Sequence, residues 1–246
     1  LHEAGVPEDV FAPIIGGGKV GGWLLNQDLD GVFFTGSHPT GQKIATAAAP
    51  KMARLQLELG GKDPMINCDE ADIEIAAKGD TTRGFVNAAQ VCKRIEPVYV
   101  FESVIDQFTE AIIEEAKKVV LGNPMDPNTD IGPMASKTQQ EKAIQKVEQA
   151  VSDGARLLAG GNVPKDFDNG YFYQPTVLDK IKPNMEIVTE ATFSPVLPIQ
   201  KVSSIEEAIQ QSNDSIYGLG CSIFTNDIDR ALTAADDIKS GTVCIN

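Results

Sequence analysis

Hydrophobic positions follow two alternating patterns along this chain. Short apolar runs bounded by glycine or polar turn residues predict strands, and the segments between them carry apolar residues at helical spacing. In residues 104–119, Phe108, Ile112 and Ala116 recur on one helical face, which core packing explains fully. Strands are expected within residues 10–18, 31–37, 54–59, 64–68, 98–103, 155–161, 171–178, 196–202, 218–225 and 242–246, and helices within 41–52, 73–89, 104–119, 137–155, 204–211 and 227–238.

The alternation of strands and helices predicts the α/β class, with parallel strands connected by helices. Residues 1–60 have the pattern of repeated units of a doubly wound sheet. A different set of elements follows the pair Gly60 and Gly61, so we expect two domains, residues 1–60 and 61–246. The glycine cluster at residues 16–18 lacks convincing GxGxxG spacing and is interpreted as a tight turn.

Composition narrows the function classes. A net charge of -14 argues against nucleic acid and against anionic membrane surfaces as partners, since both recruit lysine and arginine. We see no apolar run of the roughly 20 residues that cross a bilayer and no signal-peptide pattern, so we expect a cytoplasmic protein. The four cysteines are scattered, without a CxxC or Cys/His pairing, and we expect no metal site.

Seven separated motifs then carry a resemblance to a known family. LELGGKDP at residues 57–64 places a carboxylate beside two glycines, and NAAQVC at residues 87–92 ends on a cysteine. The others are FFTGS at 33–37, NPMDPNTDIGPM at 123–134, GYFYQPTVL at 170–178, EATFSPVLPI at 190–199 and SGTVCIN at 240–246. In this order and spacing they resemble the NAD(P)-dependent aldehyde dehydrogenase superfamily over essentially the whole chain.

The resemblance implies a fold and a chemistry. Residues 1–60 would be the end of a Rossmann-type NAD(P)-binding domain, and residues 61–246 an α/β catalytic domain that carries the thiol. Cys92 resembles the family's nucleophile, which attacks an aldehyde, and Glu58 resembles the base that activates water to hydrolyse the resulting thioester. The residues that match contacts to the cofactor, NAD or NADP, are Thr35, Gly36, Ser37, Gly41 and Phe193.

Several positions depart from the family's pattern. Ala191 replaces a glutamate that the family offers to the nicotinamide ribose. Ala89 and Ser194 replace glycines, and Ser194 is expected to stiffen its turn. The cations that follow Cys92, residues 93–94, are expected to face solvent rather than the thiol, and residue 87 is interpreted as part of a helix.

These departures keep alternatives open. A non-catalytic paralogue would use the fold as an interaction module, whereas a CoA-acylating semialdehyde dehydrogenase would transfer the acyl group to a thiol. The chain begins in what reads as a helix end and closes on an apolar strand, whereas the family carries further sequence on both sides. We therefore expect an internal portion of a protein about twice as long, one that forms a homo-oligomer in its full-length form and acts on a small aldehyde.

Overall fold

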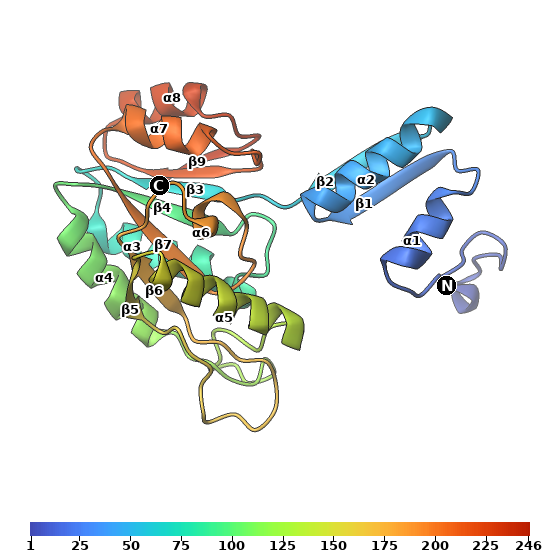
Figure 1. Ribbon diagram of the computed structural model, residues 1–246, viewed down its shortest axis with the longest axis horizontal. Coiled ribbons are helices and arrows are strands. Elements are labelled where there is room, and N and C mark those ends of the chain that lie inside the picture. Colours follow the sequence, from blue (N-terminus) through green and yellow to red (C-terminus); the bar gives the residue numbers. More distant parts are fainter. The chain divides into compact units, whose positions relative to one another are not determined.

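The computed structural model describes the backbone of residues 1–246 and every side chain except that of His2 (Figure 1). The chain divides into two compact units, Leu1–Leu59 and Gly60–Asn246. This division falls one residue before the boundary drawn from the sequence. The functional roles assigned to the two parts stay predictions.

The N-terminal unit is built around a pair of parallel strands. Its elements are η1 (His2–Ala4), α1 (Gly18–Leu25), β1 (Gly31–Gly36), α2 (His38–Ala48), η2 (Ala49–Lys51) and β2 (Arg54–Leu59). The register of the two strands places Thr35 opposite Glu58. The strand expected within residues 10–18 is wrong, because residues 11–17 are irregular and α1 starts at the last glycine of the cluster. Pro13 has no N–H to donate and glycines contribute no packing, which disfavours a strand there.

The C-terminal unit contains one seven-stranded sheet in the order β5-β6-β7-β4-β3-β8-β9. All neighbours are parallel except β5 and β6, which are antiparallel. Its strands are β3 (Asp63–Asn67), β4 (Ile95–Phe101), β5 (Arg156–Ala159), β6 (Thr176–Asp179), β7 (Val196–Val202), β8 (Cys221–Phe224) and β9 (Val243–Ile245). The helices are α3 (Ile73–Phe85), η3 (Val86–Ala89), α4 (Ile105–Lys118), α5 (Lys137–Ser152), α6 (Glu186–Thr189), α7 (Ile205–Asn213) and α8 (Ile228–Asp237).

Helices cover both faces of this sheet, with α7 and α8 on one side and α3 and α4 on the other (Figure 1). The alternation of side chains along a strand produces the two cores. On β3, Met65 packs with α3 and α4, whereas its neighbour Ile66 packs in the cluster that contains α7 and α8. Strands buried on both faces therefore appear in the sequence as continuous apolar runs, as in residues 98–101 of β4.

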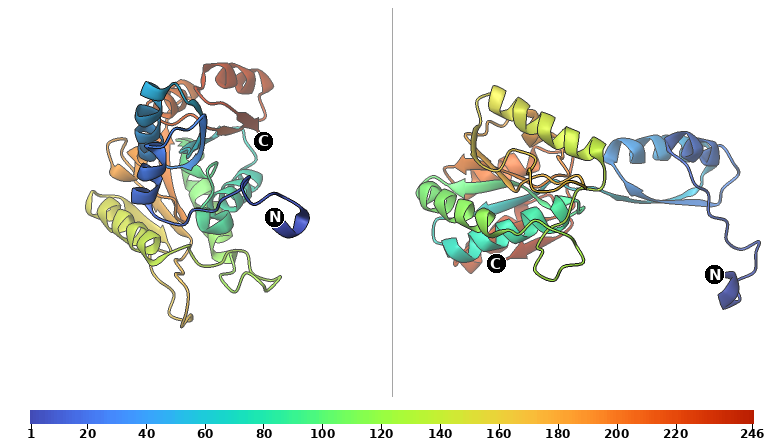
Figure 2. Two further views of the ribbon diagram at one scale, coloured as in Figure 1. Left: turned by 90° about the vertical axis from the view of Figure 1, so that its right-hand side faces the viewer. Right: turned by 90° about the horizontal axis from the view of Figure 1, so that it is seen from below.

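Two long loops, residues 120–136 and 160–175, project from the same end of this unit (Figures 1 and 2). They meet where the amide of Met134 donates to the carbonyl of Tyr171 at 3.0 Å. The strand predicted for residues 171–178 begins only at Thr176, after Pro175, which has no amide hydrogen for a sheet. Among the helices that the structure describes, none combines the length and apolar character that a membrane span needs.

Candidate active site

Cys92 lies in a tight turn between α3 and β4. The turn is closed by the amide of Arg94, which donates to the carbonyl of Val91 at 3.2 Å, and the Cys92 thiol is free and exposed. The amide of Gly61 donates to the Cys92 carbonyl at 3.0 Å. Two backbone hydrogen bonds thus fix the turn while the sulfur remains accessible.

The backbone before this turn adopts an unusual conformation. Helix α3 ends at Phe85, and Asn87, Ala88 and Ala89 then have left-handed φ values of 52°, 51° and 58°. Asn87, interpreted from the sequence as a helix residue, therefore lies outside the regular helix α3, in the short element η3 whose backbone is left-handed at this residue. Left-handed backbone costs about 1–2 kcal/mol per non-glycine residue, although asparagine tolerates it better than most. Such strain persists where surrounding contacts enforce it, often at functional sites.

Gln90 supplies part of that enforcement. Its side-chain oxygen accepts a hydrogen bond from the amide of Ala135 at 2.8 Å, and its side-chain amide donates to the carbonyl of Asn87 at 3.2 Å. The side-chain amide of Asn87 donates in return to the carbonyl of Gln90 at 3.1 Å. Residues 87–90 thus form a bend that these hydrogen bonds hold in place, and the exposed Cys92 follows it.

The candidate base belongs to the other unit. Glu58 lies on β2, is exposed, and accepts a hydrogen bond from Gln56 at 3.0 Å. Glu58 and Cys92 therefore belong to different units, and their joint action stays a prediction.

Four of the candidate cofactor residues lie where β1 passes into α2. Thr35 and Gly36 end the strand, and Ser37 occupies the N-cap position of α2. The Ser37 hydroxyl pairs with that of Thr40 at 2.9 Å instead of capping a backbone amide. Gly41 is buried, and a Cβ there would lie 2.8 Å from a methyl group of Leu59. Gly41 therefore has a packing role between α2 and β2.

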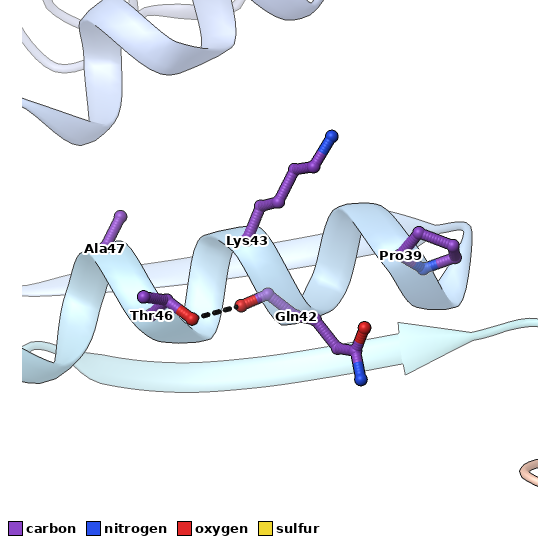
Figure 3. Close-up of a pocket in the computed structure, with 5 residues that line it drawn as sticks. All are labelled: Pro39, Gln42, Lys43, Thr46 and Ala47. Carbon is purple, nitrogen blue, oxygen red and sulfur yellow. Dashed lines mark hydrogen bonds between the residues drawn. The ribbon is translucent and has the colours of Figure 1, made fainter.

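A shallow hollow of about 420 Å³ lies along the same helix. It is lined by Pro39, Gln42, Lys43, Thr46 and Ala47, and the Lys43 side chain extends away from the helix (Figure 3). The hydroxyl of Thr46 is bonded to the carbonyl of Gln42 at 2.9 Å. The long side chains of Gln42 and Lys43 thus remain as the hollow's polar groups.

Phe193, the fifth candidate, lies in the C-terminal unit between α6 and β7. It is half-buried with a left-handed φ of 49°, and its neighbours Thr192 and Ser194 are buried. Ser194 is not among the residues with positive φ. The left-handed residue of this segment is therefore the aromatic one, not the residue that replaces glycine.

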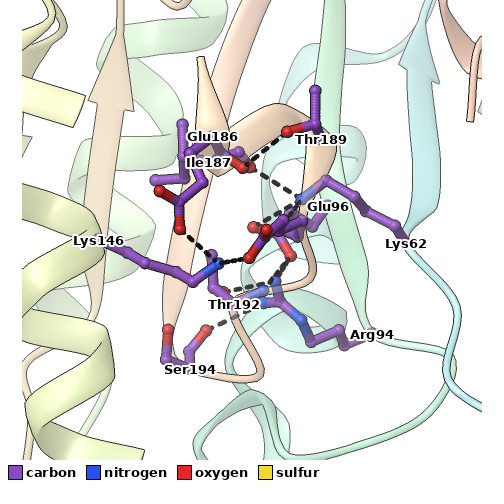
Figure 4. A network of polar contacts seen from close by, with 10 residues as sticks. Lys62, Arg94, Glu96, Lys146, Glu186, Ile187, Thr189, Thr192 and Ser194 are labelled. Atoms are coloured by element: carbon purple, nitrogen blue, oxygen red, sulfur yellow. Dashed lines mark hydrogen bonds and ion pairs between the residues drawn. The ribbon is translucent and has the colours of Figure 1, made fainter. Parts of the chain in front are cut away.

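A buried network of charges connects this segment to the Cys92 turn (Figure 4). The Arg94 guanidinium donates to the carbonyl of Ser194 at 2.9 Å and to the hydroxyl of Thr192 at 2.6 Å, and it contacts the carboxylate of Glu96. The amide of Thr192 donates to that carboxylate at 3.1 Å. The expectation that Arg94 faces solvent is wrong, because its side chain is fully buried. The amine of Lys93, in contrast, donates to Thr242 at 3.0 Å.

Lys62 completes the network from the other side. Its buried amine lies 3.0 Å from the Glu96 carboxylate and donates to the carbonyls of Ile187 and Glu190, both at 2.8 Å. Burial, reinforced by the charge of Arg94, holds the Lys62 pKa well below its usual range. Burial also lowers the pKa of Arg94 to about 9, so the guanidinium remains charged at neutral pH.

The structure thus brings together the Cys92 turn and the Phe193 segment, through residues that the motif comparison missed. A signal was present, because Arg94 and Glu96 are two positions apart at the start of a strand and so share one face. Opposite charges on one face of a buried strand indicate an internal ion pair. Among the described side chains, no group of three or more histidine, cysteine, aspartate or glutamate residues could hold a metal ion.

Comparison with known proteins identifies the family of this chain. The family model described as "Aldehyde dehydrogenase family" matches residues 1–246. A betaine aldehyde dehydrogenase of Mesorhizobium japonicum is 40% identical, over 99% of this chain and 51% of the relative. The crystal structure of betaine aldehyde dehydrogenase from Staphylococcus aureus in complex with NAD+ is 37% identical with a TM-score of 0.94, over 99% of this chain and 49% of that one.

A crystal structure of lactaldehyde dehydrogenase from Escherichia coli is also similar, with 39% identity and a TM-score of 0.93, over 99% of this chain and 51% of that one. The chain spans about half the length of the curated relatives that it matches. The fold inferred from the motifs is confirmed by these structures. On the match over residues 1–246 and these identities, the chain belongs to the aldehyde dehydrogenase family.

Proposed function

We propose that the protein containing this chain oxidises an aldehyde to the corresponding carboxylic acid, with NAD+ or NADP+ as the oxidant. The observation that carries the proposal is the Cys92 turn. Its thiol is exposed, while backbone hydrogen bonds to Gly61 and within the turn fix the residue that bears it. A structural cysteine is usually buried, as Cys68 and Cys221 are here.

The proposed chemistry begins with attack of the Cys92 thiolate on the aldehyde carbonyl carbon. The negative charge that develops on the carbonyl oxygen would be stabilised by the backbone N–H of Cys92. After oxidation, the acyl group is held on sulfur as a thioester. Glu58 would then remove a proton from the water that attacks this thioester, and the carboxylic acid leaves as the thiolate is restored.

Each unit carries candidate residues for the dinucleotide, whose nicotinamide supplies the electron acceptor when bound. In the N-terminal unit, Ser37 does not cap α2 with its own oxygen, so the first turn offers backbone N–H groups to a phosphate. The hollow beside it contains Gln42 and Lys43 as polar groups. In the C-terminal unit, Phe193 would pack against the ribose next to nicotinamide. These features fit an anionic, partly aromatic ligand.

Thiol reactivity tests the nucleophile directly. Iodoacetamide labelling of the native protein, read by peptide mass spectrometry, compares Cys92 with Cys244, which is exposed but lies outside the proposed site. Cys92 is expected to react several-fold faster. Cys68 and Cys221 serve as slow references, because burial raises the pKa of their thiols to about 11 and about 12. Equal rates for the two exposed thiols would contradict an activated Cys92 and favour the non-catalytic interaction module.

Turnover tests the reaction. With NAD+ or NADP+ and a panel that includes betaine aldehyde and lactaldehyde, Cys92→Ala should lower the rate by roughly a thousandfold or more, whereas Cys244→Ala should not. Glu58→Gln should leave a first burst of reduced cofactor and slow the steady state. Normal turnover by Cys92→Ala would refute the proposal. Faster turnover when CoA is added would instead identify an acyl-CoA-forming enzyme.

A further inference from the structure

Arg94 links two segments that lie about 100 residues apart in the sequence. Its backbone amide closes the turn that carries Cys92. Its guanidinium reaches Ser194 at position i+100 and Thr192 at position i+98. One residue therefore contacts both the proposed nucleophile's turn and the segment that carries Phe193.

Arg94 and Glu96 form several hydrogen bonds to the Thr192–Ser194 segment. Thr192 is bound twice, by its hydroxyl to Arg94 and by its amide to Glu96. The Ser194 carbonyl accepts from Arg94 and from the amide of Val196, at 2.9 and 2.7 Å. Phe193 lies between the two bound residues with a φ of 49°. Because a left-handed aromatic residue is strained, bonds on both sides are the means to keep it there.

We propose that Arg94 is a positioning residue that couples the Cys92 turn to the Thr192–Ser194 segment and so sets the orientation of Phe193. The relevance to catalysis rests on the proposed function, in which Phe193 contacts the cofactor. A planar guanidinium suits this role because its fixed fork places one terminal nitrogen on the Ser194 carbonyl, while the other terminal nitrogen contacts both the Thr192 hydroxyl and the Glu96 carboxylate.

Stability alone does not explain this arrangement. Burying a guanidinium and a carboxylate carries a desolvation cost, and well-packed apolar residues in their place are often equally stable or more so. What apolar residues cannot do is hold a carbonyl and a hydroxyl at defined positions. The polar contacts of Arg94 to Thr192 and Ser194 supply that orientation.

We call the hydrogen bonds from Arg94 and Glu96 to Thr192 and Ser194 the clamp. Hydrogen exchange tests the clamp without reference to activity. In Arg94→Met, the amides of residues 190–196 should exchange roughly tenfold faster, because two charge-assisted bonds are lost. Thr192→Val, which removes a single bond and nearly conserves volume, should give a smaller increase confined to the same peptide. Arg156→Met, which removes a surface guanidinium paired with Asp179, is the matched control and should leave this peptide unchanged.

Hydrogen exchange in the buried strand β4 distinguishes a global loss of stability from a local effect on residues 190–196. If Arg94→Met raises exchange in β4 as much as in residues 190–196, the residue is merely structural and the proposal fails, unless Thr192→Val loosens the segment alone. Unchanged exchange of residues 190–196 in both variants would also overturn it.

A double-mutant cycle measures the coupling to Phe193. Arg94→Met should weaken NAD+ binding to the intact protein by roughly tenfold in wild-type background and have little further effect in Phe193→Ala. Additive losses would show that Arg94 does not act through Phe193 and would refute that part of the inference. If wild type itself fails to bind NAD+ or NADP+ while exchange responds as expected, the clamp is supported and the proposed function is not.

Discussion

Glu96→Gln is the sharpest test of the buried network. The Glu96 side chain has no exposed surface and lies between two cations, the amine of Lys62 at 3.0 Å and the guanidinium of Arg94. It also accepts the amide of Thr192 at 3.1 Å. Glutamine keeps the size and one acceptor oxygen, but it removes the negative charge that both cations face.

The size of the effect follows from burial. Removing one partner of a buried ion pair costs about 3–5 kcal/mol, because the remaining charge stays without compensation. Deprotonation of Lys62 could relieve one of the two cations left behind, since burial already lowers its pKa. We therefore expect a loss of about 3–4 kcal/mol in the free energy of unfolding. Against a typical total of about 5–15 kcal/mol, this is a large fraction.

Urea unfolding followed by circular dichroism measures this loss, with peptide-resolved hydrogen exchange to assign it to the C-terminal unit. The sequence has one tryptophan, Trp23 in the N-terminal unit, so fluorescence follows the other part of the chain. Glu102→Gln is the matched control, because Glu102 directly follows the other end of the same strand. Its pair with Lys201 is more than half exposed on both sides, and its removal should cost less than about 1 kcal/mol.

A loss below about 1 kcal/mol for Glu96→Gln would refute the reasoning, because it would mean that the network carries no uncompensated charge. The double variant Arg94→Met with Glu96→Gln extends the test. It removes one cation together with the anion, so it should recover part of the stability lost in Glu96→Gln alone. Strict additivity of the two substitutions would contradict a direct pair.

Two further predictions concern Gly61, whose amide binds the carbonyl of Cys92, and the nearby residue Asp63. Gly61→Ala would place a Cβ 2.2 Å from a carboxylate oxygen of Asp63 and 3.2 Å from the carbonyl oxygen of Cys92. The substitution should therefore lower the free energy of unfolding by about 1–3 kcal/mol and change the iodoacetamide labelling rate of Cys92. An unchanged labelling rate would show that the turn does not depend on Gly61. Burial raises the pKa of Asp63 from 3.8 to about 6, although the hydrogen bond from the Gly220 amide opposes this shift. The folded state therefore binds the proton more tightly than the unfolded state does. The free energy of unfolding should fall by about 3 kcal/mol as pH rises from 4 to above 6. Asp63→Asn should remove this fall in urea titrations at acidic and neutral pH, and a fall of the same size in the variant would assign it to another group.

Much of the fold was predictable because local pattern and tertiary packing agree. Helix α4 occupies Ile105–Lys118 within the expected 104–119, since its apolar stripe is the face that packs on the sheet. The helix expected over 73–89 ends at Phe85 instead. Apolar spacing continues beyond that residue, but the left-handed bend at 87–89 is set by distant partners such as the Ala135 amide, which no local pattern reveals.

The candidate site shows the same limit. Motifs located Cys92 and the segment around Phe193, but they gave no reason to connect them. Arg94 was expected in solvent, because its acceptors lie about 100 residues away in the sequence and no local pattern reveals them. The exposure of a charged side chain is a tertiary property, and here Glu96, Thr192 and Ser194 supply polar partners that offset part of the cost of burial.

The two replacements of glycine therefore have different physical consequences. Ala89 has a φ of 58°, so an L-residue there carries strain that a glycine would avoid, and the bonds of Gln90 must maintain it. Ser194 has no left-handed φ, and its hydroxyl is among the buried polar atoms without a hydrogen-bond partner. What this position contributes is its backbone carbonyl, which glycine would offer equally well to Arg94. The conformation of the segment is thus set by the clamp and not by the side chain at 194, which explains how Phe193 keeps its left-handed backbone beside a residue that departs from the family's pattern.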